Sequence, residues 1–197
     1  MNDRAQTKKD PSSHGDAVAS DPALRASGVQ ARAQRSSPSQ PPAASRAAER
    51  EMLSIGAPAE PALFEPTYTY VSAYTSRCLP PQVTQRLSVA VYELYDNALR
   101  YGSNAGEVRI ELRSAAGGVR LTVTNHAEPH QLDRVRRQVA RIQDDPDAAF
   151  SGEMARFASA SQPPPMIGLV RLAHDCSLEL ELQIRDDRVE ISTLCSG

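Results

Sequence analysis

The chain has 197 residues and a formal net charge of −2, a length that allows one domain with extensions. Both of its lysines, Lys8 and Lys9, lie near the N-terminus, so the remainder does not predict the broad basic patch of a nucleic-acid-binding protein. No apolar run approaches the ~20 residues that a membrane-spanning helix requires. We therefore expect a partner that is neither a nucleic acid nor a membrane.

Residues 1–61 are predicted to be a disordered tail and linker. The first fifty residues contain few large aliphatic side chains, namely Val18, Leu24 and Val29. Such a stretch buries too little apolar surface to offset the entropy lost on ordering. It also lacks the continuous apolar segment of a signal peptide.

The cysteines Cys78, Cys176 and Cys195 are widely spaced and form no metal-ligand pattern. Cys176 follows His174 and Asp175, but nothing in the sequence activates its thiol, so a small core residue is the simpler interpretation. Free thiols are typical of a reducing compartment, and we therefore expect a cytoplasmic protein.

The folded domain is expected to span residues 62–197. Tyr, Val and Thr residues between Thr67 and Thr75 favour a strand. The next segment, Gln82 to Tyr101, has apolar residues at helical spacing and is followed by a glycine that can end a helix. This pattern predicts a long helix.

The rest of the chain alternates between strand-like and helix-like patterns. Alternating apolar residues around a Gly-Gly pair predict a β-hairpin, and the C-terminus predicts a second one. Amphipathic helices are predicted between the hairpins, with a proline-rich break at 161–165. The expected strands are 108–112, 119–123, 178–184 and 189–193, and the expected helices are 132–142, 147–160 and 167–174. This order predicts an α+β fold, a two-layer sandwich of a mostly antiparallel sheet with helices on one face.

Glu93 and Asn97 are the strongest candidates for chemistry. They are four residues apart on the predicted long helix, so their side chains lie on the same face. A carboxylate can accept a proton or orient a nucleophile, and an amide oxygen is a suitable ligand for Mg²⁺. The same spacing occurs on the solvated face of many surface helices, so the pair alone leaves both interpretations open.

The segment Glu93-Leu-Tyr-Asp-Asn97-Ala98 resembles the E-x-x-x-N-A motif, or N-box, of the GHKL superfamily of ATP-binding domains (gyrase, Hsp90, histidine kinases and MutL). The members most similar in length are the anti-sigma-factor serine kinases of bacterial partner-switching systems. The resemblance implies a Bergerat-like ATP-binding fold with ATP and Mg²⁺ as cofactors. It implies that Glu93 is the catalytic base or water-orienting residue and that Asn97 holds Mg²⁺ against the nucleotide phosphates.

Two glycine motifs of that superfamily are incomplete here. Where the family has D-x-G-x-G after the first hairpin, this chain has Asn125, and no glycine follows it closely. The resemblance places Asn125 at the adenine, although the missing glycines remove the easy approach of backbone to ligand. The second motif, G-x-G-L, corresponds to residues 166–169, where Gly168 and Leu169 match. The resemblance assigns both to cofactor binding, and the alternative for Gly168 is a simple break after the proline-rich segment.

A helical insert at 129–160 stands where the superfamily has its ATP lid. This layout resembles the divergent SiaB-like branch of these kinases. The insert contains a basic cluster that could contact phosphate or form a solvated helix face: Arg134, Arg136, Arg137 and Arg141.

Two main functions follow. The first is an ATP/Mg²⁺-binding regulator, either a serine/threonine protein kinase or an anti-sigma-type component of a bacterial partner-switching system. The second is a catalytically inactive protein of the same fold that sequesters a signalling partner through the sheet edge or the insert. Either has a protein partner, a STAS-type antagonist or a sigma factor, and either can form a homodimer. A third function, an interaction domain with accidental motif overlap, would leave Glu93 and Asn97 pointing to bulk solvent.

Overall fold

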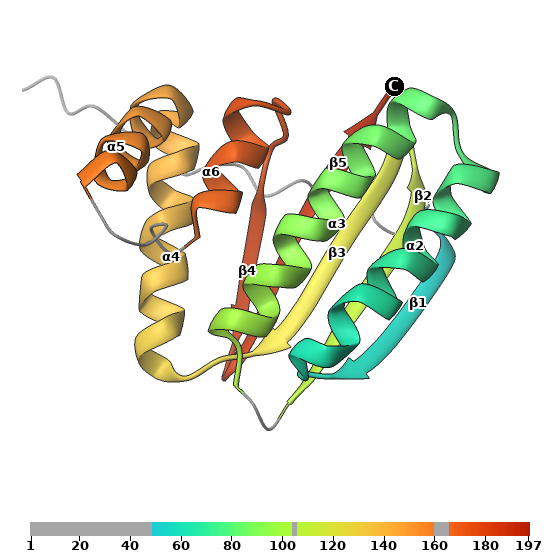
Figure 1. Cartoon of the computed structure of the whole chain (residues 1–197), viewed down its shortest axis with the longest axis horizontal. Coiled ribbons are helices and arrows are strands. Elements are labelled where there is room, and N and C mark those ends of the chain that lie inside the picture. The colour runs from blue at the N-terminus through green and yellow to red at the C-terminus, as the bar shows by residue number, and fades with distance from the viewer. Residues whose placement is uncertain (1–48, 104–105, 160–165) are drawn as a thin grey trace, which may run out of the picture. The chain divides into compact units, whose positions relative to one another are not determined.

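The computed structural model describes residues 49–103, 106–159 and 166–197, which Figure 1 shows as coloured ribbons. Five strands form a sheet in the order β1-β2-β3-β5-β4, and every neighbouring pair is antiparallel. The strands are β1 (Arg50–Pro58), β2 (Glu107–Ala115), β3 (Gly118–His126), β4 (Glu181–Arg185) and β5 (Arg188–Ser196). The helices are α2 (Phe64–Cys78), α3 (Pro81–Tyr101), α4 (Pro129–Asp144), α5 (Pro146–Ser159) and α6 (Ile167–His174), with a 3₁₀ turn at Pro61–Leu63.

The helices form one layer and the sheet forms the other (Figure 1). Helix α3 lies along the centre of the sheet, α2 lies beside it near β1, and α4, α5 and α6 lie on the side of β4. The α+β class and the two-layer arrangement predicted from the sequence are therefore confirmed.

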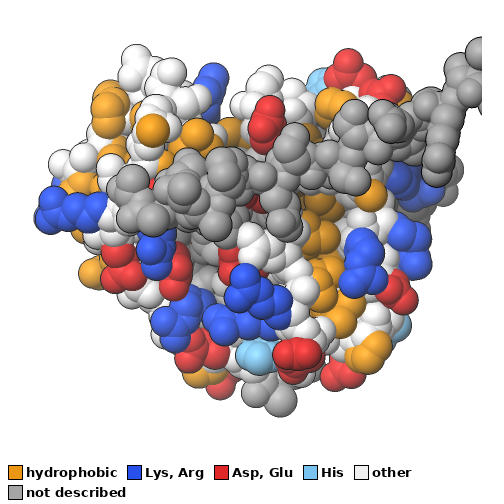
Figure 2. All heavy atoms as spheres, turned by 180° about the vertical axis from the view of Figure 1, so that it is seen from behind, with side chains coloured by type: hydrophobic (Ala, Val, Ile, Leu, Met, Phe, Trp, Pro, Cys, Tyr) orange, Lys and Arg blue, Asp and Glu red, His pale blue; other side chains and the backbone are white. Residues whose placement is uncertain are grey.

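One face of the sheet carries the core. In β2, Val108, Ile110 and Leu112 are buried and alternate with charged residues that lie on the other face. Figure 2 shows acidic and basic side chains next to one another on that side of the molecule. Helix α3 packs on the core face through residues that recur every three or four positions, namely Leu87, Val91, Leu94 and Ala98. The predicted periodicity of this helix is therefore confirmed.

The segment Phe64–Cys78 is a helix, so the strand predicted at 67–75 is wrong. The prediction followed the Tyr, Val and Thr composition, but apolar residues of this segment also recur at helical spacing. Packing against α3 selects the helix: the Phe64 ring lies 5.4 Å from the ring of Tyr95, and the two planes are within 14°. Such contacts outweigh strand propensities, which span only ~1 kcal/mol.

The folded region begins before residue 62, because β1 occupies Arg50–Pro58 and pairs with β2. We predicted this segment to be linker. Leu53, Ile55 and Ala57 alternate with more exposed residues, but the strand lies at the edge of the sheet and is only half-buried, so its pattern is weak. Residues 1–48 of the predicted tail, and the proline-rich break at 161–165, lie outside the described residues.

The other predicted elements agree with the structure within a few residues. Strand β4 begins at Glu181 rather than 178, because Leu178 donates its N–H to the carbonyl oxygen of Leu172 instead of joining the ladder. Across the described residues, no helix combines the length and the apolar character needed to cross a bilayer.

Candidate functional site

Helix α3 positions Glu93 and Asn97. It begins at Pro81, which suits the first turn of a helix, and its last turn is closed by a hydrogen bond from the Gly102 N–H to the Ala98 carbonyl oxygen at 2.9 Å. The side chain of Glu93 is only 13% exposed. An arrangement in which Glu93 points to bulk solvent is therefore excluded.

Helix α6 contacts Glu93 at two points. Arg171 Nη1 lies 3.0 Å from Glu93 Oε1. One turn earlier, the backbone of Gly168 lies so close to the Glu93 carboxylate that any side chain at 168 would collide with it, and Asn97 borders the same glycine. Glu93, Asn97 and Gly168 thus meet, although they are far apart in sequence. The sequence analysis missed Arg171, whose signal is its position one turn after Gly168.

Two opposing effects act on the Glu93 carboxylate. Burial raises its pKa above the ordinary value, and the nearby Arg171 guanidinium acts against this rise. Asp96 adds to the rise, and Arg100 opposes it. The net direction is upward, so Glu93 holds a proton more tightly than a free glutamate does. This direction suits a group that accepts a proton.

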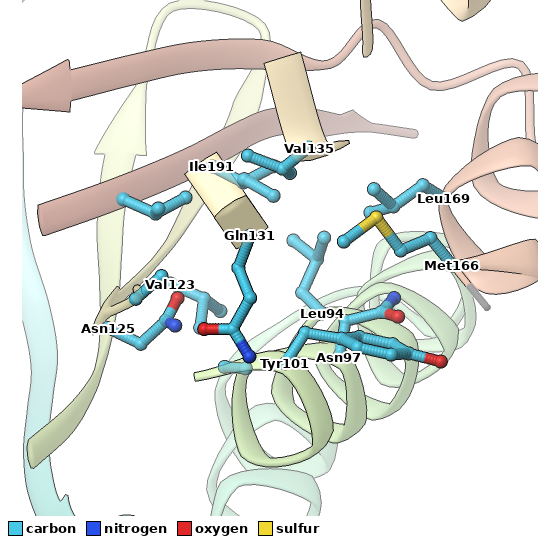
Figure 3. Close-up of a pocket in the computed structure, with 13 residues that line it drawn as sticks. Leu94, Asn97, Tyr101, Val123, Asn125, Gln131, Val135, Met166, Leu169 and Ile191 are labelled. Carbon is cyan, nitrogen blue, oxygen red and sulfur yellow. The ribbon is translucent and has the colours of Figure 1, made fainter. Parts of the chain in front are cut away.

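Asn97 and Asn125 line one cavity from α3 and β3 (Figure 3). Asn97 Nδ2 donates a hydrogen bond to the Glu93 carbonyl oxygen at 2.7 Å, which fixes the orientation of the amide. Asn125 is buried, and its Nδ2 donates to the His126 carbonyl oxygen at 3.1 Å. Leu169 is fully buried and forms an apolar part of the wall. The structure thus brings the three cofactor-site candidates Asn97, Asn125 and Leu169 to one place.

The cavity itself is small, and α4 forms part of its wall. Gln131 extends from α4 between Asn125 and Leu94, and Val135 lies next to Ile191 (Figure 3). The remaining space is about 30 Å³, which suits a water molecule, whereas ligand pockets typically measure roughly 300–1,000 Å³. The carboxylate and amide oxygens are donors that fit Mg²⁺ and its phosphates. The base and ribose of a nucleotide do not fit while α4 holds this position.

A larger cleft of about 550 Å³ lies elsewhere, between the start of β1, the α2–α3 turn and the β2–β3 turn. None of the predicted site residues lines it. Its Tyr74 hydroxyl already donates to the Met52 carbonyl oxygen at 2.9 Å. Size alone therefore favours this cleft as a ligand site. The convergence of Glu93, Asn97 and Gly168 instead favours the site between α3 and α6.

The basic cluster of the insert does not converge on the cavity as a group, although Arg134 lies beside Tyr101, which lines the cavity. Arg134 lies over the Tyr101 ring at 5.7 Å, Arg136 pairs with Asp133 at 2.9 Å, and Arg141 lies 3.4 Å from Glu153. These contacts agree with a solvated helix face rather than a phosphate clamp.

The thiols show no sign of activation. Burial raises the pKa of Cys195 to about 12 and also raises that of Cys176. Neither thiol is therefore suited to act as a nucleophile near neutral pH. Within the described ranges, no group of three or more His, Cys, Asp or Glu side chains is placed to hold a metal ion.

Comparison with known proteins identifies the fold. No family model matches the sequence, and no curated protein sequence is similar to it. A chain in the crystal structure of the SiaB–SiaC complex from Pseudomonas aeruginosa superimposes with a TM-score of 0.54 at 18% identity. The match covers 78% of this chain and 95% of that chain. The two chains share a fold. This agrees with the SiaB-like layout expected from the sequence, while ATP binding and membership of the GHKL superfamily stay predictions.

Proposed function

We propose that this chain is an ATP- and Mg²⁺-binding regulatory protein, a serine/threonine protein kinase or an anti-sigma-type component of a bacterial partner-switching system. The observation that carries the proposal is the meeting of Glu93, Asn97 and Gly168 beside the cavity that Asn125 lines. Glu93 and Asn97 come from α3 and Gly168 comes from α6, so the contact depends on the tertiary fold and not on local sequence.

Each residue has a distinct role in this proposal. The Asn97 oxygen would hold Mg²⁺, and the Glu93 carboxylate would accept or orient the proton of the attacking hydroxyl group. Gly168 belongs to the first turn of α6, whose backbone N–H groups would favour phosphate. Asn125 would contact the base. Bound MgATP would supply the phosphoryl group and neutralise the charge that develops on it.

The partner is proposed to be a protein. The structure with the similar fold is that of a complex between two proteins, SiaB and SiaC. By extension, we assign this chain a STAS-type antagonist or a sigma factor as its partner, and a homodimer is compatible with that assignment.

Thermal unfolding of the full chain with ATP tests the proposal. A ligand at 100 times its Kd adds about 2.7 kcal/mol to the free energy of unfolding. For a chain of this length, that gain raises Tm by roughly 5–10 °C. We expect the full rise with ATP and Mg²⁺ together, a smaller rise with ATP and a chelator, and a smaller rise in Asn97→Ala than in the wild-type chain at the same MgATP concentration. The Asp96→Asn variant is the matched control, because Asp96 lies on the same helix but pairs with Arg100 at 2.7 Å and does not line the cavity. Unchanged melting at millimolar MgATP would overturn the proposal.

A catalytically inactive protein-binding module is the second candidate. Two observations favour it: the cavity has room for little more than water, and α5 exposes the apolar side chains of Met154 and Phe157. If it is right, a partner captured by the wild-type chain is captured equally well by the double variant Glu93→Ala/Asn97→Ala without nucleotide. Phe157→Asp would abolish capture. If the double variant fails to capture the partner while Phe157→Asp still captures it, the nucleotide-dependent function is favoured.

A further inference from the structure

Helix α4 forms one wall of the cavity at the candidate site. Gln131 and Val135 line the cavity together with Asn97 and Asn125 and leave about 30 Å³ between them. Val135 is 6% exposed, and the next residues on the same face, Val139 and Ile142, are also buried. Val135 thus faces the cavity, and Val139 and Ile142 continue the buried apolar face of α4 beyond it.

The packing of α4 includes one unfavourable buried group. Gln138 lies on the buried face, and its Nε2 has no hydrogen-bond partner in the part of the chain that the structure describes. A buried, unpaired donor destabilises the arrangement that buries it. Polar contacts also hold α4: the exposed Arg134 lies over the ring of Tyr101, which lines the cavity, and Gln143 Nε2 donates to the Leu180 carbonyl oxygen at 2.8 Å. Release of α4 from this packing would break these two contacts, whereas the ion pairs found for α4 in the described residues lie within the helix or join it to α5, not to α3, α6 or the sheet.

Local sequence favours a helical α4 even when the helix is not packed against the cavity. Its N-terminus is closed by a capping box of Glu128 and Gln131, in which the Glu128 N–H donates to Gln131 Oε1 at 2.8 Å. Pro129 opens the helix, and Pro146 opens the next one after Asp145. Both ends are therefore defined by local sequence, so α4 can move as a rigid unit about its two flanking junctions.

We infer that α4 is an intramolecular inhibitor of the candidate site: docking of α4 through Val135 and binding of a nucleotide at Asn97 and Asn125 exclude each other. The inference rests on the proposed function for the identity of the ligand. The release of α4 can be measured without any ligand. In this arrangement the apparent affinity for nucleotide is lowered by the small fraction of molecules in which α4 is released.

The test combines hydrogen exchange and MgATP titration on the full chain and two variants. Val135→Asp places a charge on the buried face of α4 that lines the cavity. Ala140→Asp introduces the same charge at an exposed position of the same helix. In Val135→Asp we expect the amides of α4 to lose protection while those of α3 and β3 keep it, and MgATP to bind about ten- to hundred-fold more tightly. Ala140→Asp leaves both measurements unchanged. If Val135→Asp fails to fold, Val135→Ala should show the same changes with smaller amplitude.

The outcomes separate the inference from the proposed function. On the wild-type chain, MgATP should decrease the protection of α4 and increase that of α3 and α6. If MgATP instead protects α4, the helix closes over the ligand, and the inference is overturned. It is also overturned if α4 exchanges only through global unfolding, at the same free energy as α3. If α4 opens separately but no variant binds nucleotide, the release of α4 is supported and the proposed function is overturned.

Discussion

At the scale of single residues, the contact between Glu93 and Arg171 sets the electrostatics of the site. Burial makes ionised Glu93 unfavourable, and the guanidinium at 3.0 Å offsets part of that effect. Because the pKa of Glu93 is higher in the fold than in the unfolded chain, its protonation stabilises the fold below the unfolded pKa. That contribution is lost as the pH rises through the folded pKa.

Replacement of Arg171 by glutamine should raise the pKa of Glu93 further, since the opposing charge is gone. Carboxyl ¹³C titration by NMR, assigned with Glu93→Gln, measures the midpoint directly. Relative to wild type, Arg171→Gln should lower the free energy of unfolding more at pH values above the Glu93 midpoint than at pH values below it. Arg100→Gln is the control, because Arg100 is 66% exposed, pairs with Asp96 and has the smaller influence on Glu93. Equal midpoints in wild type and Arg171→Gln would contradict this explanation.

Gly168 is required by its contact with Glu93. Alanine at 168 gains helix propensity, but its Cβ must displace the carboxylate from Arg171 and Gly168. Gly152 in α5 is the matched control, since a Cβ there meets only Arg141 Nη2 at 3.5 Å, an ordinary contact. We expect Gly152→Ala to raise the free energy of unfolding by about 0.5–1 kcal/mol and Gly168→Ala to give no such gain. Urea denaturation measures both, and an equal gain in the two variants would argue against the close contact.

At the scale of secondary structure elements, periodicity predicted more than composition did. The spacing of Leu87, Val91 and Leu94 predicted α3, whereas the Tyr and Thr content of residues 67–75 predicted a strand where α2 lies. The edge strand β1 was missed because a half-buried strand has a weak apolar alternation. Local sequence indicates which face of an element is buried, but not which neighbour covers it.

Helix α4 illustrates this limit. Its amphipathic pattern was predicted, but its position beside the candidate cleft could not be, because that position depends on long-range packing against α5, α6 and β4. Likewise, the N-box pattern predicted Glu93 and Asn97 as a pair, whereas Arg171 carries no motif of its own. The convergence of the pair with Gly168 rested on the resemblance and not on spacing.

The unpaired amide of Gln138 gives a stability prediction for α4. Gln138→Met keeps the length of the side chain and removes the buried donor, so the free energy of unfolding should rise by about 1 kcal/mol. Gln143→Met is the matched change on the same helix, and it should lower that free energy by roughly 0.5–1.5 kcal/mol, because Gln143 Nε2 donates to the Leu180 carbonyl oxygen at 2.8 Å. Chemical denaturation measures the free energy of unfolding of both variants. Changes of the same sign would contradict the view that the Gln138 amide is unpaired and the Gln143 amide is paired.

At the scale of the whole molecule, the sheet order explains why the site lies where it does. Strand β3 lies between β2 and β5, and α3 packs along the face of this central strand. The end of β3 at Asn125 therefore comes close to the end of α3, and α6 approaches α3 on the other side of the cavity. The predicted order of hairpins and helices was sufficient for the fold class. It was not sufficient for the amount of space inside the site.

Calorimetric titration of MgATP into the full-length chain tests the central claim most directly. The account predicts saturable, Mg²⁺-dependent binding to the wild-type chain and to Asp96→Asn. In Asn97→Ala, loss of an interaction with a charged group should remove ~1.5–3 kcal/mol, which weakens binding about ten- to hundred-fold. Absence of binding to the wild-type chain at millimolar MgATP, or equal affinity in Asn97→Ala, would contradict the account.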